Sequence, residues 1–161
     1  MLTLTEAKRV FHYEPGSGHL IWKVGRNIGQ RAGTLHKTMG YRQVKVNGTY
    51  YNEHRIIMLI VNGDLPEGMQ VDHINHDRAD NRLVNLRFVT HTQNGRNTKL
   101  PVTNTTGVIG VSYKKKYDKY YAQIYIKGKN IYLGWHDTLE EAAAARAEAE
   151  IKYGFHPNHG L

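Results

Sequence analysis

The chain has no cysteine among its 161 residues, only 4 prolines, and no long apolar run. Without cysteine it can form neither a disulfide framework nor a zinc site closed by thiolates. No apolar stretch approaches the roughly 18 residues that a membrane span requires, and the beginning of the chain lacks the apolar segment of a signal peptide. We therefore expect a soluble, unsecreted protein of the reducing cytoplasm that has no membrane partner.

Acidic residues are also in the minority, since 14 Asp and Glu stand against 22 Lys and Arg. The formal net charge is +8 and the sequence pI is about 9.6. Such a balance favours a polyanionic partner, which could be nucleic acid, a membrane surface or an acidic protein. The apolar share of 40% is too high for a disordered chain, and the length suits one ordinary domain or two small ones.

The first half of the chain alternates short apolar segments with turn residues. Thr3 followed by Glu6 is typical of a capping box and predicts a helix, which the sequence EPGSG ends. An Asn-Gly pair after residue 46 indicates a hairpin. The elements expected here are a helix through Phe11, strands at 19–22 and 41–46, and a buried helix at 55–61, for which a strand is also compatible.

Residues 95–107, GRNTKLPVTNTTG, are polar and show no periodicity. We place a linker at 98–106 within this segment, which divides the chain into domains at 1–97 and 107–161. The second domain shows apolar alternation in strands at 109–115 and 120–126 and again after a Lys-Gly-Lys turn. A capping box at Thr138 and Glu141 then starts a helix that ends at Gly154.

The predicted fold class is therefore α+β. A small N-terminal antiparallel sheet and helices precede a three-stranded antiparallel sheet that one helix braces. The face of this second sheet away from the helix carries lysines, tyrosines and amides. Its members are Ser112, Lys114, Lys116, Gln123, Tyr125, Asn130 and Tyr132. The lysines could simply form a solvated face, and the tyrosines could simply pack across strands.

Residues 110–149 contain, in order, GVSYKKK, YAQIYI and YLGWHDTLEEAAAA. This segment resembles the ethylene-response-factor (Apetala-type) DNA-binding domain. The resemblance implies that the sheet lies in the major groove of double-stranded DNA and that the helix supports its back. The family positions that contact DNA fall on Ser112, Lys115, Gln123, Tyr125, Asn130 and Tyr132. Together with Lys114 and Lys116, these are the predicted DNA-binding residues.

The segment VDHINHDRADNRLVNLRFVTHTQNGRN, residues 71–97, concentrates three histidines, three aspartates and five asparagines. It resembles the HNH nuclease family, specifically its phage and intron branch, because Asp-His, Asp-Asn-Arg, Asn-Leu-Arg and Gln-Asn follow in the same order and spacing. The resemblance implies a ββα-metal unit at about 69–97. It also implies a homing-type endonuclease that hydrolyses phosphodiester bonds with a divalent metal, Mg²⁺ or alternatively Mn²⁺.

The resemblance also assigns roles to individual residues of this segment. Asp72 and Asn94 would be the metal ligands, and His73 the general base, since neutral imidazole can take a proton from water at physiological pH. Asn85 would tie the loop together and orient the histidine. The third motif position falls near Asn97, where many members have histidine.

Several neighbouring residues have open interpretations. His76 and His91 could lie in loops or assist the metal ligands, and Arg82 and Arg87 could contact phosphate or brace the loop. Asn75 and Asn81 are expected to be turn residues. His54 and Arg55 match an element that recurs upstream of this motif in the family, but capping and packing also explain them.

The resemblance thus implies a nuclease that acts on double-stranded DNA and needs no small-molecule cofactor. We expect it in the cytoplasm of a bacterium infected by a phage. Two other functions are alternatives to it. One is a DNA-binding protein that retains the HNH fold without catalysis. The other is a ββα unit that holds structural zinc through histidines, which the absence of cysteine disfavours.

Overall fold

The computed structural model describes residues 2–161, and its first helix begins where the sequence predicts it. The Thr3 hydroxyl accepts a hydrogen bond from the Glu6 amide and caps α1 (Leu4–Val10). The helix stops one residue before its expected end, because Phe11 is extended and starts β1 (Phe11–Glu14). This strand, which the sequence did not predict, pairs antiparallel with the predicted β2 (His19–Trp22).

A three-stranded antiparallel sheet follows, in the order β3 (Thr34–Leu35), β4 (Arg42–Val46) and β5 (Thr49–Asn52). Asn47 and Gly48 connect β4 to β5 with φ values of 47° and 83°. Two positive values are the signature of the type I′ turn that an Asn-Gly pair favours, so the predicted hairpin is confirmed. The apolar segment after it is the helix α2 (Glu53–Asn62) and not a strand.

The segment that resembles the HNH motif folds as two strands and a short helix. The strands β6 (Met69–His73) and β7 (Leu86–Thr90) pair antiparallel, with Asp72 opposite Arg87. Between them lie a loop and a single 3₁₀ turn, Leu83–Asn85, and after them comes α3 (His91–Gly95). The strand, loop, strand and helix expected from the sequence are all present.

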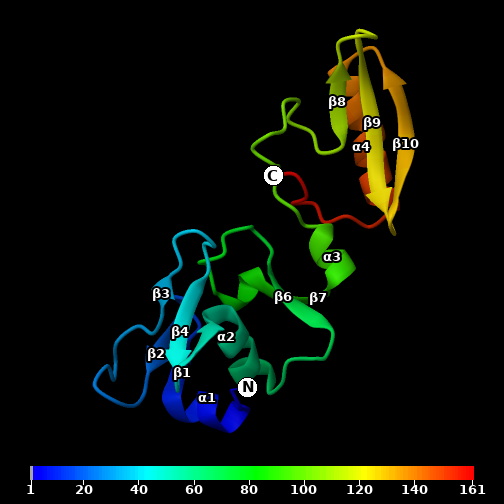
Figure 1. Cartoon of the computed structure of the whole chain (residues 1–161). Helices are drawn as coiled ribbons and strands as arrows, with labels where there is room; N and C mark the ends of the chain where they lie inside the picture. Colours follow the sequence, from blue (N-terminus) through cyan, green and yellow to red (C-terminus); the bar gives the residue numbers. More distant parts are fainter. Residues whose placement is uncertain (1) are drawn as a thin grey trace. The chain divides into compact units, whose positions relative to one another are not determined.

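The last part of the chain is a meander of β8 (Val111–Lys114), β9 (Lys119–Ile126) and β10 (Lys129–His136), followed by α4 (Leu139–Lys152). The strand order is β10-β9-β8 and α4 lies along one face of the sheet (Figure 1). Thr138 caps the helix by accepting from the Glu141 amide, as predicted. A bulge between Tyr132 and Gly134 breaks the regular alternation that the sequence suggested for β10.

The fold class is α+β, as expected. The chain forms two compact units, one ending at Asn94 and the other spanning Gly95–Leu161. Each unit has its own core: Leu20, Ile57 and their neighbours in the first, and Val111, Ala122 and Ala142 in the second. Residues 98–106 are irregular, with a turn at Val102 and Thr103, and Thr98 is hydrogen-bonded to His159 and Gly160 near the end of the chain. None of the helices within residues 2–161 is long and apolar enough to cross a membrane.

Gly18, in the turn between β1 and β2, packs directly on the loop between β6 and β7. Its φ is +73°, and a Cβ placed there would lie 2.6 Å from the Arg82 backbone nitrogen. We expect Gly18→Ala to lower the free energy of unfolding by more than about 1–2 kcal/mol, from left-handed strain plus the clash. Gly16→Ala is the matched control in the same turn, because no atom lies within 4 Å of its Cβ position. Urea denaturation of both variants measures the difference, and equal midpoints would contradict this packing role.

Candidate active site

Asp72 and His73 form the buried C-terminal end of β6. Across the ladder, the Arg87 guanidinium donates through Nε and Nη2 to Asp72 Oδ2, at 3.0 and 2.8 Å. This ion pair holds the carboxylate in one orientation and compensates its charge within the unit. Of the two roles that the sequence left open for Arg87, the structure shows the bracing contact.

Asn94, on α3, is held beside the same strand. Its Nδ2 donates to Gln70 Oε1 at 2.7 Å, and Gln70 lies two residues before Asp72 on β6. Because alternate residues of a strand face the same side, this contact brings Asn94 to the side of β6 that Asp72 occupies. Since its amide nitrogen bonds to Gln70, the oxygen of Asn94 is the atom that would serve as the predicted ligand. A carboxylate and an amide oxygen are the hard donors that suit Mg²⁺.

The imidazole of His73 is anchored on its Nε2 side. Nε2 lies 3.0 Å from Asn81 Oδ1, and Asn81 Nδ2 in turn donates to Glu53 Oε2 at 3.1 Å. Burial lowers the pKa of His73, and the bond to Asn81 partly opposes that shift. The expectation that Asn81 is a turn residue is wrong: its side chain is 1% exposed and points into the site, not toward solvent.

Asn85 closes the loop between β6 and β7. Its Oδ1 accepts from the Asn75 backbone amide at 2.9 Å, and its Nδ2 donates to the Asp80 carbonyl at 2.8 Å. The Ile74 amide also donates to the Asn85 carbonyl, at 2.9 Å. These bonds join the two ends of the loop next to His73. Asn85 therefore stabilises the fold of the loop between β6 and β7.

The other polar residues of the motif have different surroundings. Asn75 is a turn residue, as expected, since its Oδ1 accepts from the Asp77 amide. Arg82 pairs with Asp80 on the loop surface. His76 has a left-handed backbone with φ of 63°, and exposed His91 starts α3. Asn97 is buried in the second unit, so its relation to Asp72 stays a prediction.

No group of three or more His, Cys, Asp or Glu side chains in residues 2–161 is arranged to hold a metal ion. The pair predicted from the sequence is of another kind, because it combines one carboxylate, Asp72, with one amide, Asn94. The chemistry of this donor set suits a hard cation that keeps several water ligands.

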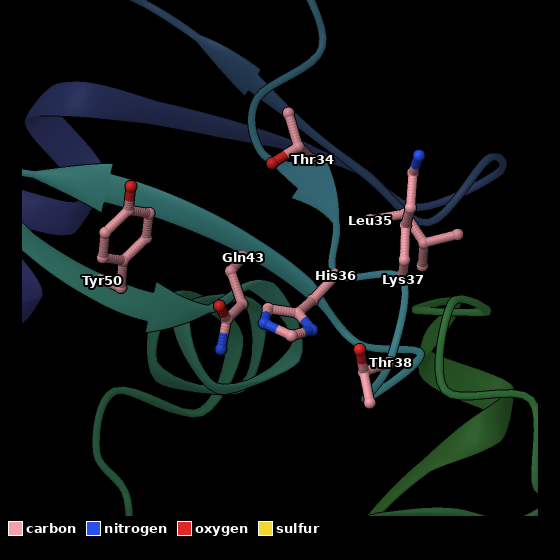
Figure 2. Close-up of a pocket in the computed structure, with 7 residues that line it drawn as sticks. All are labelled: Thr34, Leu35, His36, Lys37, Thr38, Gln43 and Tyr50. Carbon is pink, nitrogen blue, oxygen red and sulfur yellow. The ribbon is translucent and has the colours of Figure 1, made fainter.

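A hollow lies on the first unit, at β3, the turn after it and the neighbouring strands β4 and β5 (Figure 2). It is lined by Thr34, Leu35, His36, Lys37, Thr38, Gln43 and Tyr50. The turn that comes after His36 contacts the loop between β6 and β7, because Arg78 Nη1 donates to the Met39 carbonyl at 2.9 Å. The hollow is therefore connected to the loop that carries Asn81 and Asn85.

The sheet of the second unit displays most of the predicted DNA-binding side chains on one face. The register places Gln123 opposite Tyr132 and Tyr125 opposite Asn130. Ser112 and Lys114 share this face of β8, since Val111 points to the core. Lys115 and Lys116, however, lie in the turn between β8 and β9 and not on the strands. The sequence placed Lys116 on the sheet face, which is wrong.

The same face carries an aromatic cluster that the sequence did not reveal. Tyr121 stacks on Tyr132 with ring centroids 5.5 Å apart, and Trp135 meets Tyr121 edge-on at 5.1 Å. Lys114 Nζ lies 5.9 Å from the centre of the Tyr121 ring. Strand alternation could have placed Tyr121 beside Gln123. Trp135 could not be placed in this way, because it comes after the bulge.

Comparison with known proteins covers the part of the chain that contains the site. A model of the HNH endonuclease family matches residues 51–96. Protein 3.8 of Escherichia phage T7 is 33% identical over 82 residues, which are 51% of this chain and 68% of the phage protein. The chain belongs to the HNH endonuclease family. The residues matched by the HNH model include Glu53 and His54 as well as the segment from Asp72 to Asn94.

Among solved structures, the HNH homing endonuclease I-HmuI, described for its DNA binding and cleavage, is similar to this chain. The sequence identity is 22% and the TM-score is 0.44. The similarity extends over 54% of this chain and 50% of the I-HmuI chain. About half of this chain thus aligns with about half of the I-HmuI chain.

Proposed function

We propose that this HNH family member is a divalent-metal-dependent endonuclease that cuts double-stranded DNA. The observation that carries the proposal is the arrangement at the end of β6. There a buried carboxylate held by Arg87 adjoins an imidazole anchored by Asn81, and Asn94 is bonded to the same strand. Enzymes that hydrolyse phosphodiesters need a base for the attacking water and a cation for the phosphate charge. His73 would be the base, and Asp72 and Asn94 would hold the cation.

The chain's own residues divide the chemistry between them. His73 takes a proton from the attacking water, and its lowered pKa keeps the imidazole neutral and able to do so at physiological pH. Arg87 keeps the Asp72 carboxylate in place, and Asn85 holds the loop on which His73 depends. A bound Mg²⁺ or Mn²⁺ would act as a Lewis acid at the scissile phosphate and stabilise charge on the leaving oxygen.

The second unit is proposed to recognise the DNA target. Its sheet face combines lysines with exposed tyrosines and amides, and the sequence of residues 110–149 resembles a DNA-binding domain whose sheet enters the major groove. Lys114, Lys115 and Lys116 would contact phosphates, with the turn lysines extending the basic surface beyond the strands. Gln123, Tyr125 and Asn130 would lie nearer the base edges. Ser112 and Tyr132 complete the proposed surface.

The biological setting proposed for this activity is a bacterium infected by a phage. The net charge of +8 suits a polyanionic partner, and a relative is encoded by phage T7. The protein would act on DNA in the cytoplasm of the host as a homing-type endonuclease, without a small-molecule cofactor. A single active site of this kind cuts one strand at a time.

The direct test is incubation of purified protein with supercoiled plasmid and phage genomic DNA. Reactions with Mg²⁺, with Mn²⁺ and with a chelator are compared, and any new ends are mapped on each strand. Metal-dependent ends at defined positions support the proposal. Retained DNA binding without cleavage under any of these conditions would favour the alternative, a DNA-binding protein that keeps the fold alone.

The metal ligand assignment makes its own prediction. Asp72→Asn should raise the Mg²⁺ concentration for half-maximal cleavage by roughly tenfold or more, because a charged oxygen ligand becomes a neutral amide. The control Asp64→Asn removes the same charge from a position outside the motif. Titration of cleavage with Mg²⁺ compares the two variants. Equal Mg²⁺ requirements in both would contradict the role of Asp72 as a ligand.

A further inference from the structure

Glu53, the first residue of α2, is a fully buried carboxylate inside the first unit. Three donors converge on it: the Leu20 amide at 3.2 Å, Arg42 Nε at 3.0 Å and Asn81 Nδ2 at 3.1 Å. Burial raises the pKa of Glu53, while the Leu20 amide and the Arg42 guanidinium oppose that shift. Because all three contacts donate to its oxygens, the carboxylate is satisfied as an ionised acceptor.

This arrangement determines how the Asn81 amide is turned. An ionised carboxylate can only accept hydrogen bonds, so the group that Asn81 directs at Glu53 must be its NH₂. Its carbonyl oxygen then faces His73 Nε2 at 3.0 Å. An amide oxygen also can only accept, and therefore Nε2 of His73 must carry a proton. In the neutral ring, the nitrogen that bears the basic lone pair is then Nδ1.

We propose that Glu53 and Asn81 form a positioning relay that holds His73 in the tautomer with its proton on Nε2, so that Nδ1 is the nitrogen that accepts the proton of water. The inference rests on the proposed function for the role of His73 as a base, but the tautomer itself does not depend on it. Neither Glu53 nor Asn81 touches the substrate in this scheme. Both act through the ring of His73.

The ring of His73 is also confined by two neighbouring rings. His54, next to Glu53 on α2, meets it edge-on with centroids 4.9 Å apart, and Tyr41 lies 5.9 Å away. Burial lowers the pKa of His54 to about 3, so this neighbour is neutral at physiological pH and adds no repelling charge. The first turn of α2 therefore supplies both the carboxylate that orients Asn81 and a wall that limits rotation of His73.

The relay also stabilises the ring of His73 after proton transfer. When Nδ1 gains the proton, the ring becomes positive and its Nε2–H bond to Asn81 strengthens. The amide then lies between that positive ring and the Glu53 carboxylate. A serine protease triad uses a buried acid behind a histidine in the same sense, to fix the tautomer and to stabilise the charged ring. Here an asparagine stands between the acid and the histidine.

The test uses the full chain, labelled with ¹⁵N at histidine, and records the ring nitrogen shifts of His73 at a fixed neutral pH. We expect a protonated Nε2 and an unprotonated Nδ1 in the wild-type protein. Asn81→Ala removes the acceptor, and Glu53→Gln allows the Asn81 amide to flip, so both variants should show a mixture of tautomers. Single-turnover cleavage of plasmid DNA should fall at least about tenfold in each, a fraction of what a general base contributes.

A double variant separates the relay from a loss of stability. In Glu53→Gln with Asn81→Asp, the glutamine can donate to the new carboxylate, and that carboxylate again accepts from Nε2 of His73. The double variant should therefore regain the wild-type tautomer, whereas Asn81→Asp alone places two carboxylates against each other. Tyr13→Phe is the matched control, because the Tyr13 hydroxyl donates to the Asn81 backbone carbonyl at 3.3 Å and does not touch its amide.

The outcomes distinguish this inference from the proposed function. A proton on Nδ1 of His73 in the wild-type protein would overturn the relay, as would an unchanged tautomer in both Asn81→Ala and Glu53→Gln. If the protein cut DNA but showed the Nδ1 proton, the nuclease assignment would stand without the relay. If it showed the expected tautomer and rescue but cut no DNA, the relay would stand and the nuclease assignment would fail.

Discussion

His73→Ala is expected to lower single-turnover cleavage by about 10²-fold or more, because the base that takes the proton of the attacking water is removed. DNA affinity and the Mg²⁺ requirement should change little, since the variant keeps Asp72, Asn94 and the second unit. Cleavage of supercoiled plasmid and a binding titration without metal measure the two effects.

The matched control for this prediction is His91→Ala, which removes an exposed imidazole at the start of α3. It should cleave at close to the wild-type rate. Wild-type cleavage by the His73 variant would contradict the assignment of the base. A loss found instead in the His91 variant, or in His76→Ala, would transfer the role to that histidine.

Much of the fold could be predicted because its signals are local. Two capping boxes, at Thr3 and at Thr138, start helices in the structure, and the Asn-Gly pair forms its hairpin. Each signal needs only residues within one turn of the chain. The predicted helix end and the predicted alternation in β10 were wrong, because contacts with other strands determine both. Phe11 leaves the helix because it pairs with Trp22, and the bulge in β10 arises in its pairing with β9.

Part of the candidate site could likewise be predicted from local sequence, and part could not. Asp72, His73 and Asn85 belong to one short motif, so their order along the chain was enough to place them on one strand and its loop. Glu53, the partner of Asn81, was missed because it lies outside the motif: it is 28 residues from Asn81 and bonds to it only in the folded unit. A signal was nevertheless present. Glu53, Ile56 and Ile57 have helical spacing, which puts a carboxylate on the buried face of α2.

The prediction that Asn81 is a turn residue rests on its residue type alone and is wrong. Asparagine is common in turns, and Asn75 in the same loop is a turn residue. The two differ in what lies behind them, since Asn81 packs over the buried Glu53 and Asn75 faces the loop surface. The sequence alone does not show which of the two asparagines is buried.

Separating the two units should separate cleavage from target recognition. Each unit has its own core, so fragments 1–94 and 95–161 separate the two cores, with the cut in the last turn of α3. A cut near residue 105 would remove the contacts that Thr98 makes with the C-terminal residues. Fragment 1–94 should nick DNA in the presence of Mg²⁺ only at high protein concentration and without site preference. Fragment 95–161 should bind DNA without cutting it.

Substitutions in the full chain test the same division. If Lys114 contacts a phosphate, Lys114→Ala should reduce the salt slope of DNA binding by about 0.9, because one fewer counterion is released. Gln123→Ala should change the preferred sequence more than the slope. Lys152→Ala is the control, since that lysine is exposed at the end of α4, which covers the opposite face of the sheet. Binding titrations over a range of salt concentrations measure the slopes.

A different surface would be implicated if fragment 1–94 bound and cut the original target with undiminished affinity. Recognition would then lie in the first unit, where the hollow shown in Figure 2 offers Lys37, Gln43 and Tyr50. Lys37→Ala and Gln43→Ala in that fragment would then weaken binding, whereas they should leave target preference unchanged if the second unit recognises the DNA. The two sets of variants, measured on one DNA target, therefore assign recognition to one unit or the other.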